Sequence, residues 1–347
     1  MHSPFRVGVT PDFYAEVKGR FEAPVESKLG NLAWLDAEPM PAQPGNVVSA
    51  TSLNDYDAVL ALAVKFTASS VAGVTRTALI ARWGVGYDMI DVDALTANDI
   101  ALAITPGAVR RPVSEAILAL ILALGSNVVE QDRLVRAGKW RGDLPRLGRS
   151  PQGRALGSFG CGNIAQELFR LARSIGFGRF LAHDPYVSPD VAQSLGVELV
   201  TMEELFARSD YLTVNTPLST ATRGIVGADL LRRMKPTAYF INTARGPIVQ
   251  EAALIQALQE HWIAGAGLDV FEVEPLPMDS PLRQLDNVIL APHGLAWTEE
   301  LARDNSLEAC DNILTVARGE TPAAIVNKDV LARPGFQEKL AHYRRQV

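Results

Sequence analysis

The stretch Gly157-Ser158-Phe159-Gly160-Cys161-Gly162-Asn163-Ile164-Ala165 decides the fold of this chain. It carries the spacing G-x-G-x-x-A, with small residues at Gly160, Gly162 and Ala165. The first small residue allows a tight turn from strand to helix, and the second lets the backbone approach a pyrophosphate. The third lets the helix and the strand pack closely. The spacing therefore predicts a turn that binds a dinucleotide.

The sequence around this turn has the pattern of repeated strand–helix units. A helical pattern over residues 164–175 follows the turn, so the free N–H groups at its start, near Asn163 and Ile164, would face the phosphates. Other helix candidates cover 202–207 and 251–259. The strand-like apolar runs cover residues 155–159, 179–182, 197–200, 211–214, 238–241, 264–268 and 288–290. Such alternation predicts an α/β fold with a doubly wound parallel sheet.

An acidic residue follows the glycine turn at the expected distance. Asp184 stands 24 residues after Gly160, at the end of the next strand-like run and before Pro185. A carboxylate there can accept hydrogen bonds from the adenosine ribose and would repel a 2′-phosphate. The alternative is that Asp184 only starts a turn before Pro185. Because strand, glycines, helix and acid occur in order, the sequence predicts NAD as the cofactor.

The first hundred residues form a second region of short apolar runs. Each run ends in polar residues, glycine or proline, which is typical of buried parallel strands. The runs cover residues 6–9, 58–64, 78–83 and 100–104. Residues 38–46 hold three prolines and a glycine and are predicted to form a loop. Helical spacing predicts one long helix from Pro112 to about Asn127 and a last one over 298–317.

Composition argues against several other classes of function. The net charge of −6 does not suit phosphate-rich nucleic acid as the main partner. No stretch approaches the roughly 20 apolar residues of a membrane span, and Met1 to Arg6 show no signal-peptide pattern. The two cysteines, Cys161 and Cys310, lie too far apart in the sequence to suggest a metal-ligand cluster. We therefore expect a cytoplasmic protein with no metal, membrane or nucleic-acid partner.

From about Ala78 to Arg318 the sequence resembles the D-isomer-specific 2-hydroxyacid dehydrogenases. Besides the glycine turn, the matching segments in order are residues 82–91 (RWGVGYDMID), 105–107 (TPG), 234–236 (MKP), 241–246 (INTARG), 267–275 (GLDVFEVEP) and 291–293 (APH). The resemblance implies a Rossmann NAD-binding domain, residues 106–298, inserted into a smaller flavodoxin-like α/β substrate domain, residues 1–105 and 299–347. It also implies a homodimer.

The resemblance further implies hydride transfer between NAD(H) and a small D-2-hydroxy acid or 2-oxo acid, such as glyoxylate, hydroxypyruvate or a phosphoglycerate-like acid. Arg245 matches the arginine that holds the substrate carboxylate and polarises the C2 oxygen, since a guanidinium is always charged. His293 matches the acid/base histidine, because imidazole titrates near neutrality. Glu274 matches the carboxylate that orients this ring and favours its charged form.

Other roles also follow from the resemblance. Asp269 matches a residue near the nicotinamide end of the cofactor. The main-chain N–H groups around Val85 and Gly86 match a second anchor for the substrate carboxylate. Further cofactor contacts are expected at Thr216, Pro217, Thr243 and Ala244.

Two alternatives stay open at this point. Arg110 and Arg111 could bind a second anionic group of the substrate, or they could be a solvated pair at a helix start. The whole chain could also be an NAD(H)-sensing, corepressor-like binding protein without significant turnover. The set of Arg245, Glu274 and His293 favours the enzyme.

Overall fold

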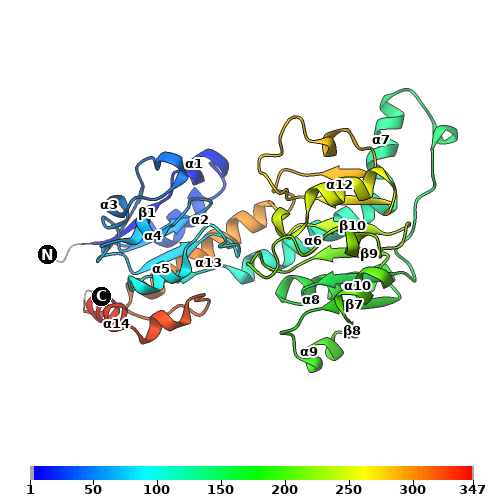
Figure 1. Ribbon diagram of the computed structural model, residues 1–347. Helices are drawn as coiled ribbons and strands as arrows, with labels where there is room; N and C mark the ends of the chain where they lie inside the picture. Colours follow the sequence, from blue (N-terminus) through cyan, green and yellow to red (C-terminus); the bar gives the residue numbers. More distant parts are fainter. Residues whose placement is uncertain (1–3, 346–347) are drawn as a thin grey trace. The chain divides into compact units, whose positions relative to one another are not determined.

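The computed structural model describes residues 4–345, so Met1 to Ser3, part of the segment in which no signal peptide is expected, lie outside the described residues. The chain forms two compact units (Figure 1). The first unit contains the described residues up to Val109 and from Trp297 onward, and the second runs from Arg110 to Ala296. Each unit is built on one parallel sheet.

The sheet of the first unit has the strand order β2-β1-β3-β4-β5. Its strands are β1 (Phe5–Val9), β2 (Leu35–Pro39), β3 (Ala58–Ala61), β4 (Leu79–Arg82) and β5 (Ala101–Ala103). This is the order of flavodoxin-like doubly wound sheets. Short helices cover one face, namely α3 (Ala50–Leu53), α4 (Ala68–Val71) and α5 (Val92–Ala97). Helices α2 (Glu22–Leu29) and α13 (Glu299–Ala317) pack together, and α13 contacts β3 and β4.

The sheet of the second unit has the strand order β12-β11-β10-β9-β6-β7-β8. Its strands are β6 (Ala155–Phe159), β7 (Arg179–His183), β8 (Val197–Leu199), β9 (Tyr211–Val214), β10 (Tyr239–Asn242), β11 (Gly265–Leu268) and β12 (Val288–Leu290). Numbered within this unit, the order is the 3-2-1-4-5-6 of Rossmann folds with one strand more. The predicted combination of a Rossmann domain and a flavodoxin-like α/β domain is confirmed.

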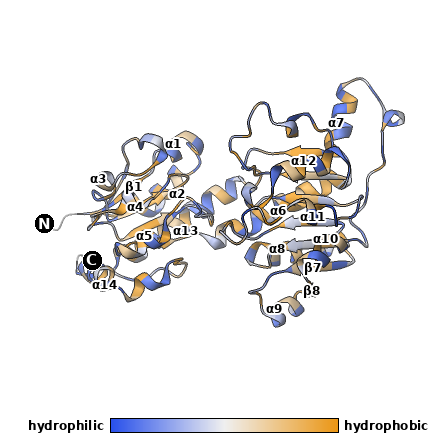
Figure 2. Ribbon diagram, viewed as in Figure 1, coloured by the Kyte–Doolittle hydropathy of each residue, from blue (hydrophilic) through white to orange (hydrophobic). Residues whose placement is uncertain are grey.

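Both faces of the central strands β9, β10 and β11 are buried, which explains their near-continuous apolar sequence. On β10, Tyr239 and Ile241 face a cluster that includes α6 (Pro106–Gly125) and α8 (Asn163–Ala172). Phe240 faces the opposite cluster, with α10 (Met202–Arg208) and α12 (Glu251–Gln259). The interior of each sheet is accordingly rich in hydrophobic residues in Figure 2. The remaining helices are α1 (Asp12–Glu16), α7 (Val128–Arg136), α9 (Pro189–Ser194), α11 (Ala228–Leu231) and α14 (Pro334–Arg344).

Two sequence predictions about local structure were wrong. The long helix was predicted from Pro112, but α6 begins at Pro106 and contains Pro112. Its first N–H groups are satisfied by Glu308, whose carboxylate accepts from Gly107 (3.2 Å) and Ala108 (2.8 Å). The cap lies about 200 residues away in the chain, but Pro106 as the first helical residue, directly after Thr105, is a local start signal that the prediction from Pro112 missed.

The other error concerns the ends of residues 38–46, which were predicted to be a loop: residues 40–43 are loop, but residues 38–39 belong to β2 and Pro44–Asn46 form a 3-10 turn. Strand β2 extends to Pro39. A proline is tolerated there because β2 is the edge of its sheet and Pro39 is its last residue.

No single helix among residues 4–345 has the length and apolar character to cross a membrane. Helices α6 and α7, which are bent by 57° at their junction, are long and apolar enough only when the two are taken together. Four residues of α6 are buried in the core of the second unit: Ile117, Leu120, Ile121 and Leu124.

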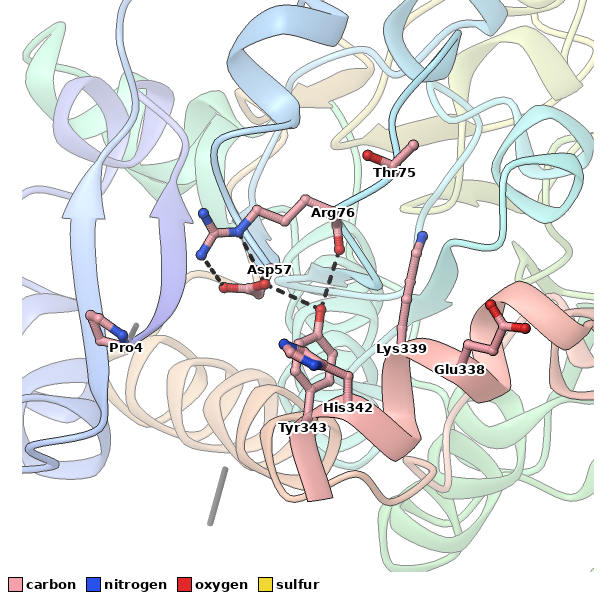
Figure 3. Close-up of a pocket in the computed structure, with 8 residues that line it drawn as sticks. All are labelled: Pro4, Asp57, Thr75, Arg76, Glu338, Lys339, His342 and Tyr343. Carbon is pink, nitrogen blue, oxygen red and sulfur yellow. Dashed lines mark hydrogen bonds and ion pairs between the residues drawn. The ribbon is translucent and has the colours of Figure 1, made fainter. Parts of the chain in front are cut away.

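Helix α14 lines an open pocket of about 470 Å³ at the amino ends of β3 and β4 in the first unit (Figure 3). Asp57, almost fully buried, accepts two hydrogen bonds from the Arg76 guanidinium and one from the Tyr343 hydroxyl. The Lys339 ammonium donates to the carbonyls of Thr77 (2.7 Å) and Asp99 (3.0 Å). These polar groups satisfy one another and fix α14 to the sheet.

Candidate active site

The residues predicted to form the site in the second unit follow the carboxyl ends of its strands. In a parallel sheet these ends lie on one edge, so their loops are neighbours. The strand order changes direction between β6 and β9, which is where doubly wound sheets bind ligands. The glycine turn follows β6, and the loops with Arg245, Glu274 and His293 follow β10, β11 and β12.

The glycine turn has the geometry that a pyrophosphate requires. Gly160 has φ +98°, and a Cβ there would lie 2.6 Å from the Asn215 carbonyl oxygen, so only glycine fits. A Cβ on Gly162 would instead point into open space. Gly162 is also the N-cap of α8, whose first residues Asn163 and Ile164 leave N–H groups at the helix start. The open side of the turn can therefore take an anion.

A second observation supports a ligand beside this sheet edge. The hydroxyl of Thr243, just after β10, is buried and has no hydrogen-bond partner among residues 4–345. A buried hydroxyl without a partner is costly, and a bound polar ligand would remove that cost. Next to it, the Ala244 N–H donates to the Asn242 side chain (3.0 Å). Thr216 and Pro217 follow β9 on the same edge. These residues fit a bound dinucleotide.

Asp184 is tied to the glycine turn and also forms the turn that follows it. One carboxylate oxygen accepts from the Cys161 N–H at 2.7 Å. The other accepts from the N–H groups of Tyr186 (2.8 Å) and Val187 (3.2 Å). The two interpretations of Asp184, as a carboxylate for the ribose and as the start of a turn, are thus compatible. The turn holds a negative charge beside the phosphate-binding loop, with Pro185 and Tyr186 as its next neighbours.

Glu274 and His293 form a hydrogen-bonded pair. Nδ1 of His293 lies 2.7 Å from Oε2 of Glu274, and Oε1 of Glu274 accepts from the Phe271 N–H at 2.9 Å. Burial opposes ionisation of this carboxyl, but the His293 ring, the Phe271 N–H and the Arg245 charge outweigh it. The net result is a lowered pKa for Glu274. Glu274 is therefore ionised at neutral pH and holds the proton on Nδ1 of His293.

Arg245 is held in place by its own loop. Its Nη1 donates to the Ala244 carbonyl at 2.7 Å, and its carbonyl oxygen accepts from Asn242 Nδ2 at 3.0 Å. A Cβ on Gly246 would lie 1.9 Å from the Phe271 carbonyl carbon, so the Arg245 and Glu274 loops are in direct backbone contact. Sequence reasoning missed the two supporting residues, Asn242 and Phe271. Only the buried asparagine at the end of a strand could have signalled the first.

Asp269 holds the turn that carries His293. It is almost fully buried and accepts from the N–H groups of Gly294 (3.0 Å) and Leu295 (3.2 Å). Burial raises the pKa of Asp269, and these two N–H groups partly offset the rise. His293 itself has φ +52°, a conformation that non-glycine residues adopt at a cost. The contacts of Asp269 compensate for that cost.

Val85 and Gly86 lie in the first unit, after β4. Both are half-buried, and neither backbone N–H has an acceptor among residues 4–345. Gly84, just before them, has φ +126°. Two consecutive N–H groups without a protein acceptor leave donors that an anion could use.

The two arginines of α6 differ in their surroundings. Arg111 donates to Glu115 (2.5 Å) and forms an ion pair with Glu167 of α8 (3.4 Å). Arg110 is exposed, and its carbonyl oxygen accepts from Ser114. Both lie within α6, after its first turn, and not at a helix start as the sequence suggested.

Comparison with known proteins gives a consistent result. The sequence pattern of the "D-isomer specific 2-hydroxyacid dehydrogenase, NAD binding domain" family matches residues 118–294. A glyoxylate reductase of Korarchaeum cryptofilum is 37% identical, over 93% of this chain and 97% of its own length. A D-3-phosphoglycerate dehydrogenase of Methanocaldococcus jannaschii is 38% identical over 76% of this chain, which spans half of that relative.

The crystal structure of a glyoxylate reductase from Paecilomyes thermophila superposes with a TM-score of 0.82 at 29% identity, covering 94% of this chain and 99% of that one. Sequence and fold therefore agree over nearly the whole length. The chain belongs to the D-isomer-specific 2-hydroxyacid dehydrogenase family, NAD-dependent enzymes that oxidise and reduce at a CH–OH carbon.

Proposed function

We propose that this enzyme reduces a small 2-oxo acid to the D-2-hydroxy acid with NADH, and runs the reverse reaction with NAD, using Arg245, Glu274 and His293. The observation that carries the proposal is the 2.7 Å hydrogen bond between His293 and Glu274, with the Arg245 charge close enough to act on Glu274. A cation, an acid/base group and its orienting carboxylate are the parts that carbonyl reduction needs.

The proton path follows from this hydrogen bond. Since Nδ1 of His293 faces Glu274, Nε2 is the ring nitrogen that gives a proton to the C2 oxygen during reduction and takes it back during oxidation. Glu274 stabilises the charged ring and fixes its orientation. Arg245 binds the substrate carboxylate and polarises the C2 oxygen. The bound cofactor supplies or accepts the hydride.

The substrate is proposed to be a small monocarboxylate such as glyoxylate or hydroxypyruvate. Arg245, with the N–H groups of Val85 and Gly86, is proposed to bind its one carboxylate. Arg111 is already paired with two glutamates, so it does not offer an uncompensated charge for a second anionic group. The relatives named glyoxylate reductase support the same choice. The alternative substrate is a phosphoglycerate-like acid, whose second anionic group would bind Arg110.

A substrate panel tests this proposal. The purified protein is assayed by NADH absorbance with glyoxylate, hydroxypyruvate, pyruvate and a phosphorylated 2-oxo acid. We expect kcat/KM to be highest for glyoxylate or hydroxypyruvate. Activity confined to the phosphorylated acid would overturn the substrate class. NADH binding without turnover on any member would instead favour the NAD(H)-sensing function.

We also propose a homodimer. Four large apolar side chains in one segment of the second unit are more than half exposed: Val128, Val135, Trp140 and Leu147. Exposed apolar groups concentrated in this way are typical of interaction surfaces. Light scattering should give twice the chain mass, and the double variant Trp140→Ser, Leu147→Ser should weaken the dimer. A monomer at micromolar concentration would contradict this proposal.

A further inference from the structure

The segment Trp83–Gly86 has a conformation that needs outside support. Gly84 adopts φ +126°, and the two following N–H groups are left without acceptors. Since these N–H groups make no hydrogen bond that would fix the backbone, other contacts must hold the segment in this conformation. The contacts of Trp83 and Gly84 show what holds it.

The first support is Thr105, which is fully buried just after β5. Its hydroxyl accepts from the Gly84 N–H at 2.8 Å, and its own N–H donates to the Gly84 carbonyl at 3.1 Å. Thr105 therefore fixes both polar groups of the glycine whose unusual φ shapes the segment. Because its hydroxyl oxygen accepts from Gly84, its hydrogen is left to donate elsewhere.

The second support is α13. Asn305 accepts the Thr105 hydroxyl hydrogen through Oδ1 at 2.6 Å, and the next residue, Ser306, accepts from the Trp83 indole N–H at 3.0 Å. Asn305 and Ser306 are almost fully buried. Two adjacent polar residues of one helix thus reach the segment by two routes, one through Thr105 and one through Trp83.

On the other side, the guanidinium of Arg82 donates through Nε to the Gly86 carbonyl at 2.9 Å. The segment is thereby restrained at Trp83, Gly84 and Gly86, while the N–H groups of Val85 and Gly86 point to no protein acceptor. Apolar residues of similar volume could fill the space of Thr105 and Asn305 without the desolvation of polar groups. What the polar pair provides is a defined direction for the Gly84 backbone.

We propose that Thr105 and Asn305 are positioning residues for substrate binding: their hydrogen bond fixes Gly84 so that the N–H groups of Val85 and Gly86 are preorganised for the substrate carboxylate. This inference rests on the proposed function, in which those N–H groups bind that carboxylate. Preorganised donors save the cost of ordering the backbone when the anion binds. Loss of the Thr105 hydroxyl should therefore weaken substrate binding more than the chemical step.

The test uses the pair Thr105→Val and Thr105→Ser, because valine removes only the hydroxyl function at similar size and serine keeps it. Thr77→Val is the matched control. Thr77 is equally buried in the same unit, and its hydroxyl donates to the carbonyls of Leu53 and Tyr56 at the other end of the sheet. Ser306→Ala is a milder variant that removes only the acceptor for Trp83.

For Thr105→Val we expect KM for glyoxylate to rise about 10-fold, the scale of the cost of fixing the backbone of one residue, with kcat within about 3-fold of wild type. The Kd for NADH should not change. Thr105→Ser should restore KM. Hydrogen–deuterium exchange of peptides covering residues 83–90 should be faster in Thr105→Val than in wild type, and unchanged in Thr77→Val. Ser306→Ala should show the same effects to a smaller degree, which keeps the test usable if Thr105→Val does not fold.

A KM that rises equally in Thr105→Val and Thr77→Val, or exchange over residues 83–90 that does not change, would overturn the inference. Failure of the proposed function gives a different result: the wild-type enzyme itself would reduce none of the 2-oxo acids. In that case the exchange measurement still decides whether Thr105 fixes the segment.

Discussion

Nδ1 of His293 lies 2.7 Å from Oε2 of Glu274, although the two residues belong to different loops 19 positions apart. The Phe271 N–H fixes the carboxylate at its other oxygen, and Asp269 fixes the backbone just after the imidazole. The pair is therefore restrained at both ends before any ligand binds. Such restraint is what a proton-transfer group requires, because a small misplacement of a catalytic group is costly in rate.

Replacing Glu274 tests the role of its charge. Glu274→Gln keeps the shape of the side chain but removes the negative charge that favours the protonated imidazole. We expect kcat for 2-oxo acid reduction to fall by about 10- to 100-fold, within the range for impaired acid catalysis. The fall in kcat should be larger at alkaline than at acidic pH, because a low proton concentration at alkaline pH adds to the loss of the Glu274 charge in disfavouring the protonated imidazole. A pH–rate profile parallel to that of wild type would argue against the role of the charge.

Cofactor choice is predicted to depend on Asp184. The carboxylate disfavours a 2′-phosphate, and no arginine follows at positions 185 or 186. We expect kcat/KM for NADH to exceed that for NADPH by at least about 10-fold, equivalent to 1.4 kcal/mol. Asp184→Ser should narrow this ratio. Because Asp184→Ser also loses the hydrogen bonds of the turn, its Tm should be measured in parallel. Equal kcat/KM for NADH and NADPH in the wild type would refute the prediction.

The two arginines of α6 are predicted to behave differently. Arg111→Ala breaks ion pairs with Glu115 and Glu167, so it should change kcat/KM for monoanionic and dianionic substrates equally. If the substrate carries a second charge, Arg110→Ala should lower kcat/KM for the dianion selectively, by about 10-fold for a charge-assisted hydrogen bond. A selective loss in Arg111→Ala would show that its ion pairs open to bind substrate.

Lys339 should make stability depend on pH. Burial lowers its pKa from 10.5 to about 8, with Asp99 acting weakly in the opposite direction. The folded state therefore binds fewer protons than the unfolded state between these values, and the stability contribution of Lys339 rises with pH in that window. From pH 7.5 to 9, the wild type should gain about 1 kcal/mol in unfolding free energy relative to Lys339→Met.

The wild type must be compared with Lys339→Met because other groups also change stability over this pH range. Burial raises the pKa of Cys161 to about 11 and that of Cys310 to about 12, so their contributions fall as the unfolded thiols ionise. Both cysteines are present in the wild type and in Lys339→Met, so their contributions cancel in the difference in unfolding free energy. Lys18→Met, at an exposed position of the same unit, serves as the control and should show no such pH dependence. A constant difference in stability across the window would contradict the assignment to Lys339.

The sequence revealed those features that depend on short-range pattern. The turn at Gly160 and Gly162 could be recognised because backbone sterics demand glycine at a fixed distance from a strand and a helix. The repeated strand–helix pattern predicted a doubly wound parallel sheet, and the family resemblance implied the Rossmann and flavodoxin-like classes of the two units.

Features that depend on distant partners could not be read in the same way. The start of α6 is fixed by Glu308, and Gly84 is fixed through Thr105 by Asn305, 200 residues further along the chain. The turn with His293 depends on Asp269, whose contacts are likewise made only in the folded chain. No local propensity reports such pairings, because each partner looks like an ordinary polar residue in its own segment.

The central claim is that His293 transfers the proton to the C2 oxygen. The measurement that tests it most directly is kcat/KM for the best 2-oxo acid in His293→Gln, together with the Kd for NADH. We predict a fall in turnover of about 100-fold or more, the usual scale for loss of a general acid, with NADH affinity unchanged. Near-normal turnover in the folded variant would contradict the account.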